Sequence, residues 1–222
     1  MKRTLTLVAL ATILATPAFA QIGVAIRAGT LGPGINVAYG ISDKLAVRAT
    51  GSYLTYSIND SIDEEVTVDL EGEATIGAVG VAVDYHPFGN FFRLSGGLNV
   101  NLFEVSGTGL PTGSYCLGDG DAAACDGKLF APNRLGSFGA TLSYSSAIAP
   151  YAGIGFGRVA GKQRIGLLLD IGALYTGSPE IDLDGSGLLA PTASPEQENT
   201  LNQGIESFQW FPVVSVGVAV RI

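Results

Sequence analysis

The final stretch of this 222-residue chain, Trp210-Phe-Pro-Val-Val-Ser-Val-Gly-Val-Ala-Val-Arg-Ile222, decides the fold. On an extended backbone, one side of it carries only apolar residues: Val214, Val216, Val218, Val220 and Ile222. The other side carries Val213, Ser215, Gly217, Ala219 and Arg221, which are mostly small or polar. This period of two predicts a β-strand with one apolar surface. In a soluble sandwich that surface would face a core, whereas in an outer-membrane barrel it would face lipid, with Trp210 and Phe211 at the membrane interface.

The N-terminus predicts export. Met1-Lys-Arg3 is a positive start, residues 5–14 form a short apolar run, and Ala18-Phe-Ala20 is a small-x-small cleavage site. The apolar run is too short to serve comfortably as a membrane anchor. We therefore predict a cleaved signal peptide over residues 1–20 and an outer-membrane barrel domain over residues 21–222.

Composition narrows the protein class. The chain has 20 acidic and 12 basic residues, a net charge of −8, 31 glycines and only 14% charged residues. Soluble proteins average about a quarter charged residues. An acidic chain is a poor partner for nucleic acid. After the signal peptide no apolar run approaches about 18 residues, so no transmembrane helix is expected. Low charge with many short alternating runs predicts an all-β protein in which half of each strand faces something apolar.

Alternation along the chain predicts ten antiparallel strands in an up-and-down transmembrane β-barrel. They lie at about residues 22–30, 35–41, 45–56, 66–86, 91–105, 135–144, 150–158, 164–175, 180–188 and 210–222. Eight strands are the alternative, if the ninth fails and the first hairpin is one bent strand. The apolar phase of the fourth strand changes between Val68 and Val79, which predicts a bulge between Gly72 and Gly80. A short helix is expected from about Pro195.

The turns predict an orientation. Short connections follow the even strands, at residues 42–44, 87–90, 145–147 and 177–179, and most of the longer or acidic loops follow odd strands. Outer-membrane barrels have short periplasmic turns and longer outer loops. The longest loop, about residues 106–133, holds Cys116 and Cys125. In an exported chain this pair predicts a disulfide, and a metal site is the weaker interpretation because the only histidine, His86, is distant in sequence.

The polar strand faces favour a barrel over a sandwich. The solvent-exposed face of a soluble sheet would be rich in Lys, Glu and Thr. The polar faces of these strands instead consist mostly of Gly, Ser, Ala and Asn, with single charged residues. A narrow lumen accounts for this mixture, with each buried arginine paired to a carboxylate. The residues predicted to line the lumen are Arg27, Arg48, Arg93, Asn99, Asn101, Asp170 and Arg221.

Several segments together resemble a family of small, mostly uncharacterised proteobacterial outer-membrane β-barrel proteins. The segments are residues 29–32, 41–45, 84–89, 149–157, 175–179 and 210–222. The resemblance implies an outer-membrane location, contact with membrane lipid and lipopolysaccharide, and insertion by the barrel-assembly machinery. The assembly signal would be Val214, Val216, Val218, Val220 and Ile222. Such signals usually end in Phe or Trp, so Ile222 departs from the pattern.

No cofactor, metal or catalytic residue is predicted. Asp84-x-His86 resembles an omptin-like protease only in this pair, and His86 is expected at the periplasmic end, where packing beside Pro87 is the simpler interpretation. The single histidine also argues against a lipid A deacylase. Asp119, Asp121 and Asp126, or Asp182 and Asp184, could collect calcium, but solvated acidic loops are favoured over ligands. The alternate glycines Gly153, Gly155 and Gly157 form a small lumen face and are not a nucleotide loop.

The expected function is therefore that of a non-enzymatic outer-membrane barrel, either structural or a narrow channel for small solutes. The alternative is a surface protein that binds a ligand or mediates adhesion through acidic outer loops, residues 106–133 above all. An outer-membrane barrel enzyme is the second alternative.

Overall fold

The computed structural model describes residues 21–63, 67–118, 125–160 and 164–222. The predicted signal peptide, residues 1–20, and the candidate calcium ligands Asp119 and Asp121 lie outside these ranges.

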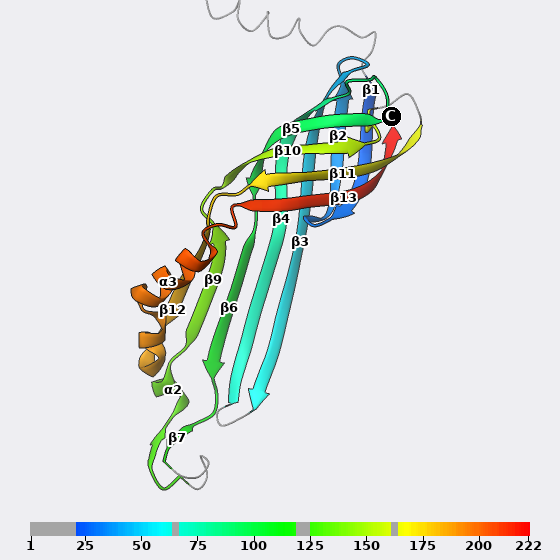
Figure 1. Ribbon diagram of the computed structural model, residues 1–222. Helices are drawn as coiled ribbons and strands as arrows, with labels where there is room; N and C mark the ends of the chain where they lie inside the picture. The colour runs from blue at the N-terminus through cyan, green and yellow to red at the C-terminus, as the bar shows by residue number, and fades with distance from the viewer. Residues whose placement is uncertain (1–20, 64–66, 119–124, 161–163) are drawn as a thin grey trace, which may run out of the picture.

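Eight antiparallel strands of the described chain close into a barrel (Figure 1). They are β1 Gln21–Gly29, β2 Gly32–Gly40, β3 Leu45–Asp63, β4 Thr67–Tyr85, β5 Phe92–Asn101, β10 Ile148–Phe156, β11 Ile165–Tyr175 and β13 Trp210–Arg221. The last strand pairs with the first, Val24 opposite Val220. Pairing of β4 with β5 closes the ring on the other side, so the barrel wall has no free sheet edge.

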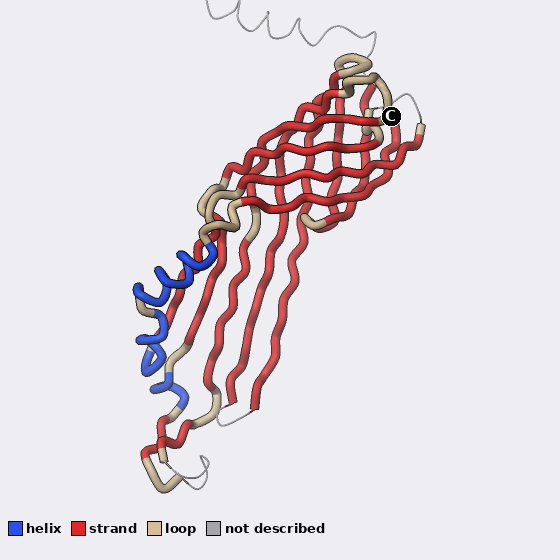
Figure 2. The backbone as a smooth tube through the Cα atoms, in the orientation of Figure 1, coloured by secondary structure: helices blue, strands red, loops and turns tan. Residues whose placement is uncertain are grey.

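A second sheet region, which we call the extension, continues from one end of the barrel. The distal halves of β3 and β4 run on past the ring and are joined by β6 Glu104–Pro111, β9 Phe138–Tyr144 and β12 Pro179–Gly185. Beyond them lie the hairpin β7 Tyr115–Leu117 and β8 Lys128–Phe130 and the helix α2 Pro132–Leu135. The 3-10 helix η1 Gly187–Ala193 and α3 Pro195–Ile205 lie beside the extension (Figure 2).

The helix expected from about Pro195 is present. Pro195 occupies the first turn, and the Ser194 side chain accepts a hydrogen bond from the backbone N–H of Gln197. Both features favour a helix start. No helix among the described residues has the length and apolar character needed to cross a membrane.

The barrel has eight strands where ten were preferred. The predicted sixth and seventh strands are β9 and β10. The chain runs through them one after the other without reversing direction, and β9 lies in the extension whereas β10 lies in the wall. The predicted ninth strand is β12, which lies only in the extension. The first hairpin, β1 with β2, is nevertheless two strands.

Two turns assigned to the periplasmic end therefore lie at the opposite end. The N–H of Ser146 donates to the carbonyl of Thr176 at 3.2 Å, and that of Asn101 donates to the carbonyl of Ala147 at 2.8 Å. These bonds join the segments next to the ends of β5, β10 and β11, where the barrel wall meets the extension. The chain bends at Ser145–Ala147 and Gly177–Pro179 without reversing, a distinction that turn composition alone does not make.

The predicted bulge in β4 is absent. The β3–β4 register runs without a break from Leu45 opposite Tyr85 to Asp63 opposite Thr67. The apolar phase changes because the surroundings of the strand change. In the wall the outward residues Val79, Val81 and Val83 are apolar, whereas in the extension the same side carries carboxylates and the opposite side is apolar.

The barrel is polar inside and apolar outside. Its outward-facing side chains include Ile26, Val81, Leu98, Leu167 and Val216, each more than half exposed. Its interior buries Asn36, Arg48, Asp84, Arg93, Ser95 and Asp170. Soluble proteins rarely show so large an apolar surface, and a lipid-facing barrel requires one.

Candidate functional site

Two arginines and two aspartates form a charged cluster across the lumen. The Arg93 Nη2 atom lies 2.6 Å from Asp170 Oδ1, and the Arg48 Nε atom lies 3.0 Å from Asp84 Oδ2. Arg48 also lies 3.6 Å from Asp170, so Asp170 pairs with both arginines. Ser95 donates to Asp84 at 2.6 Å. The side chains of the two arginines and two aspartates are at most 3% exposed, and equal numbers of opposite charges make this burial tolerable.

The cluster is held by four strands and shaped by a glycine. Arg48 comes from β3, Asp84 from β4 and Arg93 from β5, while Asp170 lies on β11, which is opposite β3 in the ring and two strands from β5. Arg93 also donates to the carbonyl of Gly157. A Cβ at Gly155 would lie 2.7 Å from Arg93 Nε, so this position needs glycine to make room for the guanidinium.

Apolar side chains close the lumen on both sides of the cluster. Toward the termini, Val159 packs with Ala25, Ala38, Leu168 and Ala219. Gly23 permits this, because a Cβ there would collide with the Val159 carbonyl. Toward the extension, the second group is Leu31, Ala78, Ala149, Leu174 and Val213. The cavity between Arg27, Arg48, Asn99 and Tyr151 measures about 20 Å³, room for about one water molecule.

The residues predicted to line the lumen occupy different levels of it. Arg48, Arg93 and Asp170 meet in the cluster. Arg27 is half-buried and donates to Ser52 at 2.6 Å, and Asn99 is buried beside the small cavity. Asn101 lies at the level where the strands leave the ring and caps the Phe103 N–H at 3.2 Å. Arg221 is exposed at the terminal rim.

Sequence reasoning missed Asp84 and Ser95 as members of the cluster. Both lie on the inward phase of their strands, Asp84 two residues from the buried Ala82 and Ser95 two residues from Arg93. That phase was the signal that could have identified them. Asp84 was instead weighed with His86, and it is engaged by Arg48 and Ser95.

His86 follows β4 in the turn at the terminal end of the barrel. Its ring is buried, and burial lowers the pKa to about 4, with the nearby Arg158 acting in the same direction. The imidazole is therefore neutral at neutral pH, as expected of a packed side chain.

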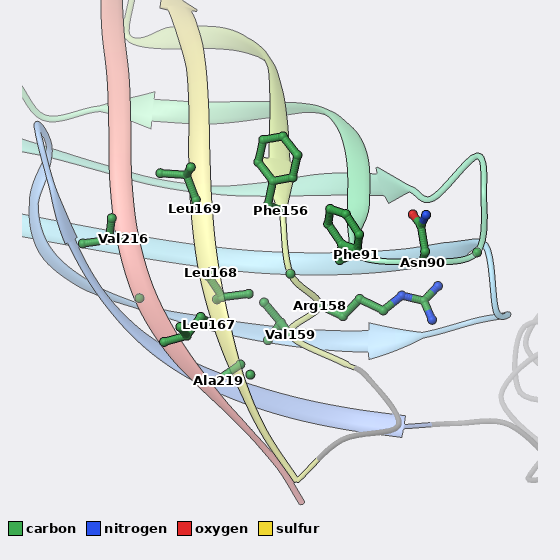
Figure 3. A pocket seen from close by; sticks show the side chains of 14 residues that line it. Asn90, Phe91, Phe156, Arg158, Val159, Leu167, Leu168, Leu169, Val216 and Ala219 are labelled. Atoms are coloured by element: carbon green, nitrogen blue, oxygen red, sulfur yellow. The ribbon is translucent and has the colours of Figure 1, made fainter.

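A larger pocket of about 760 Å³ lies in the barrel wall at the same end (Figure 3). It forms where the β10–β11 ladder stops at Phe156 opposite Leu169. Its lining is mostly apolar, with Phe91, Leu167 and Val216 among the side chains, and Arg158 and Asn90 beside Phe91. These chemical features suit a hydrocarbon chain better than a polar substrate.

The extension has one apolar face and one acidic face. Cross-strand pairing puts Tyr56, Ala74, Val105, Leu142 and Ile181 in one row on the apolar face. The opposite face carries exposed carboxylates from three strands: Asp69, Glu71, Glu73, Glu104, Glu180, Asp182 and Asp184. None of the strand segments in the extension sheet contains Lys or Arg. This face is therefore a strongly negative surface.

The loop residues have separate places. Cys116 and Cys125 form the expected disulfide. Asp182 lines a polar groove of about 360 Å³ between β12 and α3, together with Glu180, Glu198 and Glu206. Within the described residues, no three or more His, Cys, Asp or Glu side chains are grouped so as to hold a metal ion. Val214, Val216, Val218 and Val220, which were expected to belong to an assembly signal, all face outward from β13.

Comparison with known proteins identifies the fold. No protein-family model matches the chain, and no curated protein matches it. Among solved structures, Acinetobacter baumannii CarO2 matches with a TM-score of 0.57 and 20% identity, over 91% of this chain and 98% of that one. Acinetobacter baumannii CarO matches with a TM-score of 0.55 and 22% identity, over 90% and 97%. A major outer membrane protein from Thermus thermophilus matches with a TM-score of 0.43 and 15% identity, over 91% and 99%. The chain thus shares its closed antiparallel barrel fold with CarO2 and CarO.

Proposed function

We propose that this chain is an integral outer-membrane barrel that does not conduct solutes and that binds a ligand through its extension outside the cell. The observation that carries the proposal is the sealed lumen. Along the described residues the charged cluster lies between two apolar layers, and the cavity beside it measures about 20 Å³, so a path for hydrated solutes through this level would require the cluster to come apart. No catalytic role is proposed.

The orientation follows from the termini. The last strand ends beside the first, Gly23 opposite Arg221, at the barrel end away from the extension. In outer-membrane barrels the termini lie in the periplasm, so the extension would project outward. The apolar outer wall would contact lipid, lipopolysaccharide would surround the outer rim, and the barrel-assembly machinery would insert the chain.

The extension supports ligand binding. It holds a sheet of five strand segments, an acidic face and a disulfide-closed hairpin well beyond the ring. A rigid barrel that only reinforced the membrane would not need such a structure, and binding residues commonly lie on segments held by a rigid scaffold.

Two measurements test the proposal. Membrane fractionation with a heat-modifiability gel should find the protein in the outer membrane, with a faster-migrating unheated band. The purified full chain should then give no conductance steps in planar lipid bilayers. A soluble periplasmic protein without a gel shift would contradict the membrane barrel, and steady conductance steps would restore the narrow-channel hypothesis.

A further inference from the structure

The two edges of the extension sheet are treated differently by the fold. The β12 edge is covered by α3. The Asn202 side-chain amide accepts from the Ile181 N–H at 2.7 Å and donates to the Ile181 carbonyl at 3.2 Å. Glu198 accepts from the Leu183 N–H at 3.5 Å. These two side chains replace the bonds of a neighbouring strand, which is one way in which proteins protect a sheet edge.

The β3 edge has no such cover among the described residues. Its pairing with β2 ends at Ser52 opposite Gly34, whereas its pairing with β4 continues to Asp63. Residues 55–59 therefore have a partner strand on one side only. At the far end, the Ser61 N–H is already satisfied by the Asp60 carboxylate at 2.9 Å.

The register identifies which backbone groups face outward. The carbonyls of Thr67 and Gly77 accept from Thr112 and Leu102, so odd-numbered residues of β4 direct their backbone away from β3. Even-numbered residues of β4 therefore face β3, and they lie opposite even-numbered residues of β3. By alternation, Thr55, Ser57 and Asn59 point their N–H and C=O groups to the open edge.

We propose that the β3 edge binds an extended polypeptide in which apolar and basic residues alternate. The peptide would add a strand to the sheet through the backbone groups of Thr55, Ser57 and Asn59. This inference rests on the proposed function, because it gives the extension its class of ligand.

The two faces beside the edge specify the side chains. On one face, Tyr56 and Ile58 are 65% and 54% exposed and would pack against apolar residues of the added strand. On the other face, Glu71 and Glu73 of β4 lie one strand further in. Strands are about 4.8 Å apart, so the carboxylates lie within reach of a lysine or arginine side chain that extends across β3.

Charge disfavours a second copy of this chain as the occupant. Pairing β3 with β3 of another copy would join two acidic faces into one continuous surface and add to its negative charge. A basic peptide adds no negative charge, and its lysine or arginine side chains offset the repulsion among the carboxylates already on the acidic face.

The test uses the full chain in detergent micelles and labelled eight-residue peptides, with binding followed by fluorescence anisotropy. The alternating Val-Lys peptide should bind. Three control peptides should not: one with the same composition in two blocks, one with alternating Val and Glu, and one Val-Lys peptide that is N-methylated at every second residue. The last control keeps each side chain and removes only the strand-pairing donors. Binding should weaken as salt rises.

Matched variants locate the site. In Ser57→Pro the ring removes an edge-facing N–H without removing a β4 ladder bond, so the sheet should persist. We expect Ser57→Pro to weaken Val-Lys binding about tenfold or more, and Ser57→Ala to leave it nearly unchanged. Glu71→Gln with Glu73→Gln should reduce the salt dependence.

The outcomes separate this inference from the proposed function. Equal binding of the block, N-methylated and alternating peptides would overturn strand addition, and so would the absence of binding to a folded, heat-modifiable protein. Both results would leave the non-conducting barrel intact. If Ser57→Pro fails to fold, the N-methylated peptide on the unaltered chain still decides the question. A chain that never enters the membrane would contradict the proposed function first.

Discussion

At the residue scale, the charged cluster is the feature on which the closed lumen depends. Two guanidinium groups and two carboxylates balance each other where water is nearly excluded. Removing one partner of such a network leaves a buried charge without compensation, which costs far more than the intact pair contributes.

Replacing Arg93 by leucine should therefore destabilise the barrel by about 3–5 kcal/mol. The substitution leaves Asp84 and Asp170 to share Arg48. Urea unfolding of the refolded protein in detergent micelles, followed by the heat-modifiability gel, measures the change. Arg93→Lys keeps the charge and should cost less. A variant Arg93→Leu with an unchanged unfolding midpoint would contradict the paired-cluster interpretation.

His86 predicts a dependence of stability on pH. Burial lowers the pKa of the folded imidazole to about 4, whereas an unfolded histidine has a pKa near 6.5. The unfolded chain therefore takes up the proton first. The contribution of His86 is fully present above about pH 6.5 and is lost as the pH falls toward about 4.

The measurement compares the unfolding midpoint of the unaltered chain with that of His86→Gln between about pH 7.5 and 4.5. Within this window the imidazole of the unfolded chain becomes protonated while that of the folded chain stays mostly neutral. The variant should lose less stability across this window, since other acid-titrating groups act in both proteins. Parallel pH profiles for the two proteins would contradict the assignment.

At the element scale, α3 acts as a cover for one sheet edge. Asn202 makes both bonds that a neighbouring strand would make to Ile181, and Glu198 adds a third to Leu183. The helix has no buried residues, so these polar contacts carry much of its attachment to β12.

Asn202→Ala should release this edge. Two lost hydrogen bonds to a half-buried strand are worth about 1–3 kcal/mol of local stability. Amide hydrogen exchange at Ile181 should rise by one to two orders of magnitude, while exchange in the barrel strands stays unchanged. Gln203→Ala, at the next helix position, is the matched control. Equal protection of Ile181 in both variants would show that α3 does not cover the edge.

At the scale of the whole molecule, one pair of strands crosses two environments. β3 and β4 keep a single register from the ring to the tip of the extension, and the apolar residues change sides on the way. In the proposed orientation, the outward side would face hydrocarbon along the ring and water beyond it. The change of side, between Tyr53 and Leu54 on β3, would then mark the outer boundary of the membrane.

An arginine placed outward should therefore be costly in the wall and harmless in the extension. Val81→Arg should reduce barrel stability by about 2–4 kcal/mol in lipid bilayers, the range for a site near the bilayer midplane. Thr108→Arg, exposed on the acidic face, should change stability by less than about 0.5 kcal/mol. Urea titrations in lipid vesicles measure both. Similar effects at the two sites would contradict the proposed membrane boundary.

The sequence alone determined the strand character of the chain, the helix at Pro195, the disulfide and the all-β barrel class. These features depend on period-two alternation, capping and local spacing, which the amino-acid order carries directly. It also identified Arg48, Arg93 and Asp170 as inward-facing, because strand parity follows from their neighbours.

Only the tertiary structure decided what depends on non-local pairing. The number of wall strands is eight because Ser145–Ala147 and Gly177–Pro179 bend the chain without reversing it, and both outcomes use the same turn residues. Asp84 joins the cluster because β4 and β5 place it beside Ser95. Asp170 meets Arg93 along the wall, past Gly155, and meets Arg48 from the opposite side of the lumen. The change of apolar side in β4 looked like a backbone bulge, because a sequence records which residues are apolar but not whether lipid, water or protein surrounds them.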